Sequence, residues 1–583
     1  MYLAMTNAAI AGDDFDNDFT TSGRIAIGGS MTGNVQFGGD TDWFRITLTQ
    51  GQRYLLSIGG DVQTNTGPPG GTLNRPAITL RDSLGNVVAA ADYTVGANPF
   101  INYTAGSSGD FFLEARSSNA AATGTYLVAA KPYVSATEMA AMMIGDFWKS
   151  ILHPFTKLNL TVFYADLTPV EQMYAQKAQE VFSDVANINF TSVANAAGAD
   201  IVYSNKGTGI ATGGNGKITI SSDFVTGSSF NSMVFQINLH ELGHALGLGH
   251  PGPYNASPQY GVSNVFANDG LQFSVLSDFG WMGADLHNSI LTPQMADIVA
   301  LQMLYGVNTT TRTGNSTYGF HSTVGSFFDF ATYGPRVAFT IYDAGGIDTL
   351  DASLYAMSQT LDLSSGGFSS VGGYQGNIGI SLTTVIENAV GGSGNDSIIG
   401  NVSDNVLWGA DGNDYVSGLN GNDSINGNVG NDTVHGDAGA DVVLGGKGDD
   451  VVFGDEGDDV QLHGNVGNDT VYGGAGSDMI YGGQDNDRLY GEAGNDYLSG
   501  DKGNDTLTGG DGADRFHFSA NGSDDRVIGF SASQGDQVLL DAGITYSAAQ
   551  SGVDTVLTFG SGEHVVLEGV ALSSLQAGWI VFG

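Results

Sequence analysis

The segment HELGHALGLGH, which begins at His240, has the residue types and spacing of a zinc site. His240 and His244 are four residues apart, so on a helix both rings lie on one face and can bind one ion. Gly247 can adopt the left-handed conformation that ends a helix, which lets His250 return as a third ligand. Three histidines leave a coordination position open for water, as a catalytic zinc requires. We therefore predict one catalytic Zn²⁺, with Glu241 as the general base that takes and returns the proton.

A second chemical pattern is a nine-residue frame that starts at Gly391 and runs fourteen times to His517. Thirteen frames carry Asp at the sixth place, and Asn405 takes that place in the frame that begins at Gly400. One additional residue, which we place at His463, shifts the phase. Six glycine-rich turn residues tolerate positive φ, and carboxylate and carbonyl oxygens are the ligands that Ca²⁺ prefers.

The last three residues of each frame alternate around an apolar one, which predicts a short strand with one buried face. A solvated acidic linker would have no reason to keep this register. The frame resembles the RTX nonapeptide repeat, which implies a Ca²⁺-bound parallel β-roll. The predicted calcium ligands are Asp396, Asp414, Asp423, Asp432, Asp441, Asp450, Asp459, Asp469, Asp478, Asp487, Asp496, Asp505 and Asp514.

The charge of the chain follows this repeat. The 583 residues include 61 acidic and 19 basic ones, for a formal net charge of −42, and no cysteine. Residues 391–517 hold 24 of the acidic residues and four basic ones. Such a chain will not bind nucleic acid by neutralising phosphates, and it has no apolar run long enough to predict a membrane span. On the order of ten Ca²⁺ would cancel the repeat's charge, so we expect calcium to fold this segment.

Elements that can position the zinc ligands lie in residues 134–308. We expect a helix over 136–149, a strand over 158–164 and a second helix that begins after Thr168, with Glu171 completing a capping box. Further strands and the zinc helix over 232–246 make this an α+β domain. Residues 1–133 contain several short strands separated by turn signals, which predicts a β-sandwich. Its short motifs resemble the pre-peptidase C-terminal type of domain.

Six further stretches carry a resemblance to the serralysin family of metzincins. They are residues 182–190, 250–252, 298–306, 311–320, 343–351 and 387–392. The resemblance implies a secreted bacterial zinc endopeptidase with a C-terminal calcium-binding β-roll. It also implies calcium binding between the protease and the roll, at Arg312, Gly314, Asp343, Gly345, Gly346, Asp348 and Glu387. A plain glycine turn is the alternative interpretation of Asp343 and Asp348.

The strand pattern of the first 133 residues and the serralysin resemblance of the rest together predict three regions: a β-sandwich accessory domain at 1–133, an α+β metzincin protease domain at 134–308, and a parallel β-roll with a C-terminal cap and secretion signal at 309–583. The resemblance implies protein and peptide substrates as partners, and the likeness to RTX proteins implies the type I secretion machinery, which fits the lack of a Sec signal in the first dozen residues. We expect an extracellular monomer. Residues 1–133 could instead act as a pro-domain over the cleft.

One position departs from the family pattern. The family turn reads Ser-x-Met-Ser-Tyr, and this chain has Leu276 for the Met and Asp278 for the Tyr. The leucine nearly conserves volume, but an ionised carboxylate cannot donate a hydrogen bond to an oxyanion. Three interpretations remain open: a slower enzyme with another donor, direct zinc ligation by Asp278, or a shifted alignment in which Tyr254 or Tyr260 serves. A non-catalytic, calcium-dependent adhesin-like protein is the alternative function.

Overall fold

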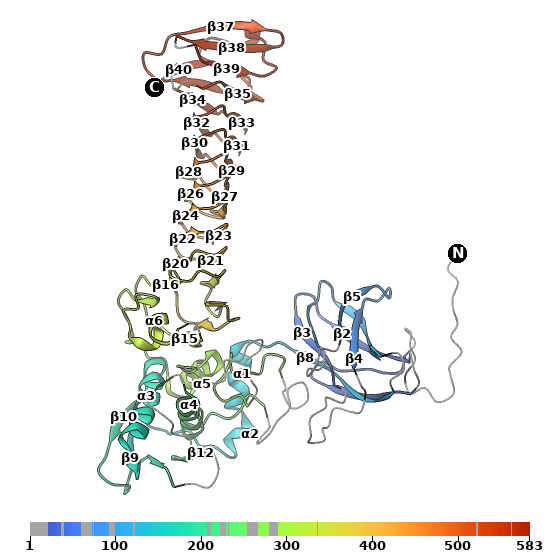
Figure 1. Ribbon diagram of the computed structural model, residues 1–583, viewed down its shortest axis with the longest axis vertical. Helices are drawn as coiled ribbons and strands as arrows, with labels where there is room; N and C mark the ends of the chain where they lie inside the picture. Colours follow the sequence, from blue (N-terminus) through green and yellow to red (C-terminus); the bar gives the residue numbers. More distant parts are fainter. Residues whose placement is uncertain are drawn as a thin grey trace.

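The computed structural model describes residues 15, 21–36, 40–59, 73, 75–92, 100–119, 123–206, 211–221, 229–230, 232–252, 266–278, 290–334, 336–519, 523–560 and 562–583. It consists of an N-terminal part made of two sheets, a mixed helical and stranded part, and a long column of short strands (Figure 1).

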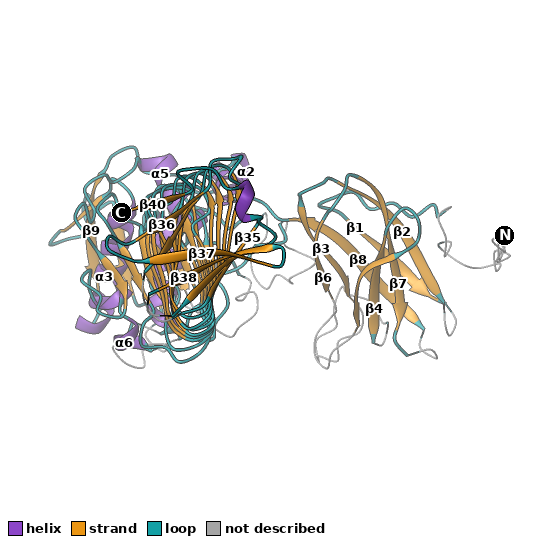
Figure 2. Ribbon diagram, turned by 90° about the horizontal axis from the view of Figure 1, so that it is seen from above, coloured by secondary structure: helices purple, strands orange, loops and turns teal. Residues whose placement is uncertain are grey.

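The N-terminal part contains two antiparallel four-stranded sheets, with strand orders β1-β8-β3-β6 and β2-β7-β4-β5. Alternate residues of β2 are buried, among them Phe44 and Ile46, and they share one apolar cluster with Leu56, Leu113 and Val128. The two sheets therefore enclose a core of their own (Figure 2). The strands are β1 (Ser30–Val35), β2 (Thr41–Leu48), β3 (Arg53–Gly59), β4 (Pro76–Arg81), β5 (Val87–Asp92), β6 (Phe100–Thr104), β7 (Gly109–Ser117) and β8 (Gly124–Pro132).

The middle part combines a five-stranded sheet, of order β10-β9-β11-β13-β12, with five helices. Strands β10, β9, β11 and β13 are parallel neighbours, and β12 pairs antiparallel with β13. The strands are β9 (Asn159–Ala165), β10 (Asn189–Ser192), β11 (Ile201–Ser204), β12 (Ala211–Gly214) and β13 (Lys217–Ile220). The helices are α1 (Ala136–Met143), α2 (Asp146–Lys149), α3 (Pro169–Val185), α4 (Met233–Ala245) and α5 (Met295–Tyr305).

Two of the helix predictions can be compared directly. The capping box of α3 is confirmed, because Thr168 accepts from the Glu171 amide while Glu171 accepts from the Thr168 amide. The single helix predicted over 136–149 is wrong. Gly145 is extended, at φ −71° and ψ 177°, and it separates α1 from α2.

The column is a β-roll in which the described residues form two twelve-stranded sheets, and the chain alternates between them, so that from β20 to β36 the even-numbered strands lie in one sheet and the odd-numbered strands in the other. The even sheet contains β14 (Thr317–Gly319), β16 (Thr349–Asp351), β20 (Asn388–Val390), β22 (Val406–Asp411), β24 (Ser424–Val429), β26 (Val442–Lys447), β28 (Gln461–Val466), β30 (Met479–Gln484), β32 (Tyr497–Lys502), β34 (Arg515–Phe518), β36 (Gln537–Leu540) and β40 (Ile580–Phe582). The second sheet contains β17 (Thr360–Asp362), β21 (Ser397–Asn401), β23 (Tyr415–Leu419), β25 (Thr433–His435), β27 (Val451–Glu456), β29 (Thr470–Ala475), β31 (Arg488–Ala493), β33 (Thr506–Asp511), β35 (Asp525–Ile528), β39 (His564–Leu567), β38 (Asp554–Phe559) and β37 (Tyr546–Ser551).

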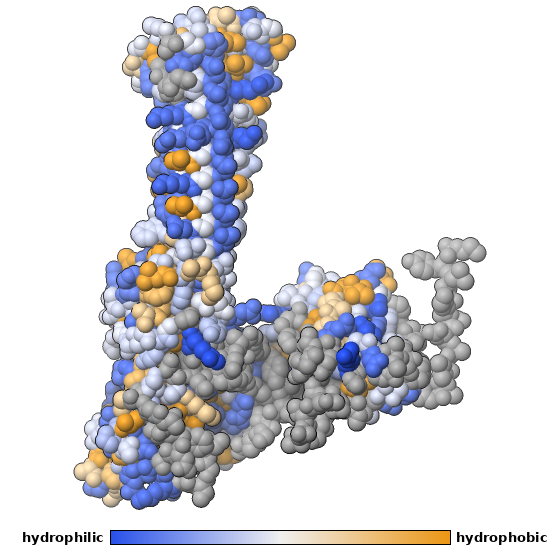
Figure 3. Space-filling view, viewed as in Figure 1, coloured by the Kyte–Doolittle hydropathy of each residue, from blue (hydrophilic) through white to orange (hydrophobic). Residues whose placement is uncertain are grey.

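Within the repeats, each strand pairs in parallel with the strand two positions away, as the nine-residue frame predicts. The apolar residue at the eighth place points between the sheets and is fully buried in Val416, Val434 and Val452. The face of the roll seen in Figure 3 is mostly hydrophilic, with a few apolar residues on it. Among the described residues, the roll ends in the antiparallel strands β37, β38 and β39.

The prediction that His463 is the extra residue of the repeat is wrong. His463 keeps the regular register, opposite Leu444 on one side and Tyr481 on the other. Val460 is the additional residue: it is 54% exposed, and both its amide and that of Gln461 donate to the Asp441 carbonyl oxygen. The loop absorbs the insertion before the strand begins, so the buried positions stay in phase.

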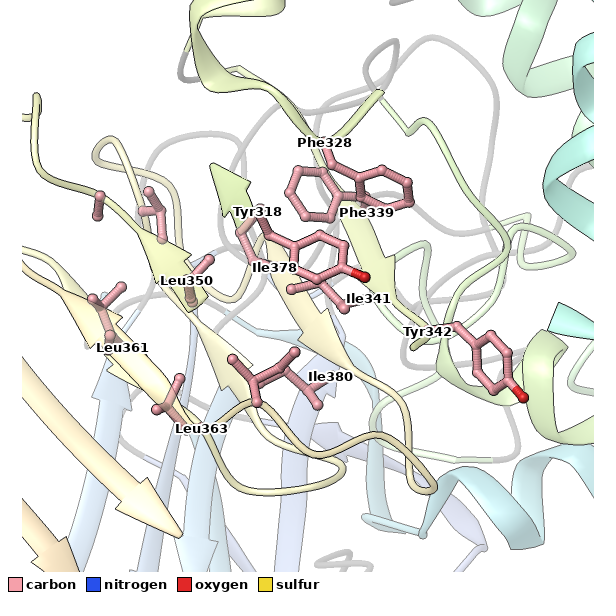
Figure 4. Packing of buried hydrophobic residues seen from close by; sticks show 14 of the residues in the cluster. Tyr318, Phe328, Phe339, Ile341, Tyr342, Leu350, Leu361, Leu363, Ile378 and Ile380 are labelled. Atoms are coloured by element: carbon pink, nitrogen blue, oxygen red, sulfur yellow. The ribbon is translucent and has the colours of Figure 1, made fainter. Parts of the chain in front are cut away.

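The middle part and the roll share one continuous apolar core. At their junction lie the three-stranded sheet β15 (Phe339–Ile341), β19 (Ile378–Ile380) and β18 (Phe368–Ser369), the helix α6 (Phe330–Tyr333) and a 3-10 turn, Ser326–Phe328. Tyr318, Phe328 and Phe339 lie close together there, with Leu350 and Leu361 on the side of the roll (Figure 4). The zinc-ligand helix and the roll are thus connected by packed side chains.

Candidate functional site

Helix α4 carries the first two predicted zinc ligands. Its N-terminus is capped by Ser232, which accepts from the Phe235 amide. The Nε2 atoms of His240 and His244 lie 3.0 Å apart, while each Nδ1 lies against a carbonyl oxygen, that of Val275 at 2.9 Å and that of Leu248 at 2.8 Å. A carbonyl can only accept, so both Nδ1 atoms carry the proton and both Nε2 lone pairs face each other.

His250 completes the group. Nitrogen atoms of His240, His244 and His250 all lie within 4.8 Å of one another. The return of the chain depends on Gly247, whose φ is +95°, as predicted. His250 is 4% exposed, and its ring packs edge to face on Trp148.

The electrostatics of the group favour a bound cation. Burial lowers the pKa of His240 and His244, and each pKa is lowered further by neighbouring histidines, so the rings are neutral at pH 7. Glu241 is 8% exposed, and its burial, with the nearby charge of Asp278, raises its pKa to about 7. Two ligands that share one zinc ion at bonds of about 2.1 Å lie roughly 3.3 Å apart, close to the observed Nε2 separation. The residues present therefore fit a zinc ion.

A tight turn below α4 holds the first ligand in place. Leu276 is buried under the helix, where a Cβ at Gly243 would lie 2.7 Å from its side chain. Asp297, at the start of α5, accepts from the Ser274 hydroxyl at 2.6 Å and from the Val275 amide at 2.8 Å. Val275 donates to Asp297 through its amide and accepts from His240 through its carbonyl oxygen. Asp297 therefore orients the His240 ring by holding this turn in place. Our sequence reasoning missed Asp297, although a lone acid at the start of an apolar helix was the available signal.

Asp297→Asn should weaken zinc binding about 10- to 100-fold, which is the usual effect of losing a group that orients a ligand. The native carboxylate accepts from three donors, those of Ser274, Val275 and Gln294. In the variant, the NH₂ group of the asparagine side chain faces one of these donors, and two donors cannot form a hydrogen bond. Competition with a chromophoric chelator measures the affinity. Asp269→Asn is the matched control, since Asp269 is equally buried and bonds Ser277 of the same turn. Equal zinc affinity in both variants would contradict the role of Asp297.

Asp278 lies beside the histidine group. Its Oδ2 is 3.8 Å from Nδ1 of His250, and its side chain is 26% exposed. Among the described residues, the group of side chains that can share one ion contains the three histidines and does not include Asp278. Direct zinc ligation by Asp278 therefore has no geometric support. Tyr254 and Tyr260, the tyrosines of the third interpretation, lie outside the described residues.

Most of the calcium ligands predicted at the junction come together. The Asp348 amide donates to Glu387, its Oδ1 accepts from Ser316, and its buried Oδ2 has no hydrogen-bond partner. Burial, with the charges of Asp343 and Glu387, raises the pKa of Asp348 to about 7. Asp343 accepts from the Tyr318 hydroxyl and from the Gly345 amide.

Gly346 leaves room in this cluster, and the side chain of Arg312 points away from it. A Cβ at Gly346 would lie 2.7 Å from the Gly314 carbonyl oxygen and 2.8 Å from Asp348 Oδ1. The guanidinium of Arg312 is directed at Asp184 and the Tyr342 carbonyl oxygen. Arg312 can therefore offer a cation only its backbone oxygen.

The aspartates of the repeat form a ladder. From Asp414 to Asp514, each Oδ1 accepts from the amide of the sixth-place residue one full coil earlier, as in the bond from Asp432 N to Asp450 Oδ1 at 2.8 Å. In Asp423 this donor is Asn405. The second oxygen, Oδ2, is buried and has no hydrogen-bond partner in twelve of these residues: Asp414, Asp423, Asp432, Asp441, Asp450, Asp459, Asp469, Asp478, Asp487, Asp496, Asp505 and Asp514. A buried carboxylate oxygen without a partner is costly, and a line of such oxygens is suited to Ca²⁺.

The space beside these oxygens and their pKa values agree with cation binding. A Cβ at Gly409 would lie 2.4 Å from Asp414 Oδ2, so the first glycine of the frame keeps this place open. Burial raises the pKa of Asp450 to about 7 and that of Asp487 to about 8, with neighbouring aspartates adding to both shifts.

The ends of the ladder differ from its middle. Both oxygens of Asp396 are already occupied, by the amides of Gly392 and Gln359, so this predicted ligand does not fit a cation as the others do. Asp525 and Asp536 continue the ladder by accepting from the Asp505 and Asp514 amides. Our sequence reasoning missed both, because they lie 20 and 22 residues along the chain and break the nine-residue spacing.

Comparisons with known proteins match the C-terminal half most clearly. The family described as Peptidase M10 serralysin C terminal matches residues 307–415. The RTX calcium-binding nonapeptide repeat matches residues 426–460, 461–489 and 490–521. Among solved structures, the pre-Peptidase C-terminal Domain of Collagenase from Bacillus anthracis covers 19% of this chain and 93% of that domain, at 16% identity and a TM-score of 0.15, too low to support an argument.

Curated relatives are serralysins. Serralysin B of Dickeya chrysanthemi is 38% identical over 261 residues, which are 40% of this chain and 53% of that protein. Serralysin of Proteus mirabilis is 36% identical over 294 residues, which are 45% and 59% of the two chains. The chain thus spans somewhat more than half the length of these relatives. Among the described residues, no helix has the length and apolar character needed to cross a membrane. The chain is thus similar to serralysins over part of its length, and its repeats match the RTX calcium-binding nonapeptide repeat.

Proposed function

We propose that the protein is a secreted, zinc-dependent endopeptidase of the metzincin class that hydrolyses peptide bonds of extracellular proteins. The observation that carries the proposal is the convergence of His240, His244 and His250, with nitrogen atoms within 4.8 Å of one another and the buried carboxylate of Glu241 beside them. A bound zinc ion supplies Lewis acidity toward water and the substrate carbonyl.

The chain's own residues divide the remaining work. The carbonyls of Val275 and Leu248 hold Nδ1–H of His240 and His244, so each ring keeps its Nε2 lone pair directed at the ion. Glu241 accepts a proton from water and returns it to the leaving amine, and its raised pKa, about 7, suits it to both transfers near neutral pH.

In this proposal the three regions keep the roles expected from the sequence. Residues 134–308 form the protease, and residues 309–583 form the calcium-dependent roll with a type I secretion signal. Residues 1–133 form an accessory sandwich of the pre-peptidase C-terminal type. The repeat matches and the serralysin relatives support an extracellular location. The chain is proposed to act as a monomer.

Digestion of casein tests the activity. With saturating Ca²⁺ throughout, a zinc-selective chelator should abolish cleavage, and added Zn²⁺ should restore it. Absence of cleavage at saturating Zn²⁺ and Ca²⁺ would overturn the proposal and favour a calcium-dependent binding protein with an inactive protease site.

Asp278→Tyr should raise kcat. The side chain at this position lies beside His250, and an ionised carboxylate there cannot donate a hydrogen bond to the developing oxyanion. Loss of one such donor costs roughly 10²–10³ in kcat in other enzymes, so restoring it should recover part of that factor. Steady-state kinetics on a peptide substrate measure the change. An unchanged kcat would mean that another group already serves as the donor.

A further inference from the structure

A third group of side chains with metal-ligand chemistry lies on the roll, and it contains none of the three histidines of α4 and none of the ladder aspartates. Among the described residues, His435, Asp437 and Asp455 each offer a ligand atom, and these atoms all lie within 4.8 Å of one another. None of the three occupies the sixth place of a frame, so the repeat does not account for them.

The roll's geometry brings the three together. His435 ends β25, and Asp455 lies in β27, the parallel neighbour of β25 one coil further along. The side chain at the ninth place of a frame therefore lies beside the side chain twenty residues further along, which occupies the second place of a later frame. His435 Nδ1 lies 2.9 Å from Asp455 Oδ2. Asp437 follows His435 by two residues, and its Oδ2 accepts from Ser417 and Leu419.

The imidazole is held in one orientation by stacked rings. Its centroid lies 4.3 Å from that of Phe453, with the two planes 5° apart, and Tyr415 lies on its other side at 5.6 Å. Phe453 stacks in turn on Tyr472 at 5.0 Å. A ring fixed in this way loses little freedom when it binds an ion.

Lysine and arginine are scarce in this part of the roll. Lys447 is the only basic residue between positions 411 and 487, and it lies in β26 of the opposite sheet. The side chains are also accessible, since His435 is 22% and Asp455 37% exposed.

We propose that His435, Asp437 and Asp455 bind one divalent transition-metal ion such as Zn²⁺, with water as the remaining ligand. Imidazole with carboxylates is a donor set for zinc and its neighbours, whereas Ca²⁺ takes oxygen ligands. His435 Nδ1 and Asp455 Oδ2 are at hydrogen-bond distance, 2.9 Å, so a bound ion would take the place of the shared proton and the two atoms would move slightly apart. Because the ligands come from two coils, the ion cross-links β25 to β27.

Zinc stoichiometry of the full chain in saturating Ca²⁺ tests the proposal, with a competing chromophoric chelator as the reporter. Wild type should bind two equivalents and His435→Gln one. His517→Gln is the matched control: His517 also lies in a roll strand, β34, and is 3.1 Å from Asp541, but among the described residues it belongs to no three-ligand group. It should bind two. Two equivalents in His435→Gln would overturn the site.

Two further variants separate this site from the catalytic one and from misfolding. A His240→Ala/His244→Ala double variant should keep one equivalent, and loss of all zinc would overturn the proposal. If the histidine group of the proposed protease site does not bind zinc, wild type should bind one equivalent of zinc and His435→Gln should bind none. Should His435→Gln lose its calcium-dependent circular dichroism, Asp437→Asn replaces it: loss of the same equivalent supports the site, and retention overturns it.

Discussion

Glu241→Gln should abolish casein cleavage while the protein keeps its zinc. The amide has the shape of the carboxylate but cannot take a proton from water, and a positioned general base contributes about 10²–10⁴ to the rate. The three histidines and the carbonyls that orient them are unchanged, so the metal content should be unchanged. The measurement is kcat/KM on a peptide substrate alongside zinc content by chelator competition.

Glu171→Gln is the matched control for this variant. Glu171 and Glu241 are both 8% exposed, but Glu171 serves the capping box of α3. Its replacement should lower stability and leave kcat/KM at the wild-type value. Full activity in Glu241→Gln would contradict the assignment of the base, and loss of zinc in that variant would show that Glu241 supports the site rather than acting in catalysis.

Removing calcium should unfold the roll of the full chain at pH 8. Twelve aspartates each bury an oxygen with no hydrogen-bond partner, and without cations nothing offsets the desolvation and mutual repulsion of their charges. Far-UV circular dichroism and hydrodynamic radius should both change on addition of a chelator, and added Ca²⁺ should reverse both changes. Identical spectra with and without calcium would contradict the dependence.

Asp449 and Asp450 are neighbours in one turn of the roll, and they provide a matched pair of variants for the calcium experiment. Asp450→Asn removes a ladder charge, so the chain should need more Ca²⁺ to fold. Asp449 is an exposed residue that bonds Asn468, and Asp449→Asn should leave the calcium midpoint unchanged.

Acid should partly replace calcium. The pKa of Asp450 is raised to about 7 in the folded roll, so between pH 4 and 7 the folded state binds more protons than the unfolded one. The stability of the calcium-free roll therefore falls as pH rises through this window. A calcium-free roll equally unfolded at pH 5 and pH 8 would contradict this.

Local patterns accounted for much of this fold. The HELGHALGLGH segment predicted the end of α4 and the return of His250, because helix geometry and a glycine turn act over a few residues. The nine-residue frame likewise predicted the parallel strands and their buried eighth position. In each case the signal and the structure it specifies are close together in the chain.

What could not be predicted depends on distant contacts. Asp297 supports His240 through a turn some twenty residues before it, and Asp525 and Asp536 meet the ladder outside the regular spacing. The position of the extra residue, Val460 and not His463, could not be predicted either. The spacing of the repeat shows that a residue has been added, but it does not show which residue of the turn lies outside the regular register. The break between α1 and α2 could not be predicted because it depends on the extended backbone of one residue, Gly145.

The alternation of the roll between two sheets restricts how its length can change in evolution. Because strands pair with those two frames away, as Asp432 does with Asp450, loss of one frame would move every later strand to the opposite sheet. The cap strands β35 and β36 would keep β33 and β34 as neighbours but would exchange sheets, so the cap would lie on the other side of the roll relative to the junction with the middle part. Loss or gain of two frames, 18 residues, leaves every later strand in its own sheet. Rolls of this kind should therefore differ in length by even numbers of frames, while single added residues collect in the turns.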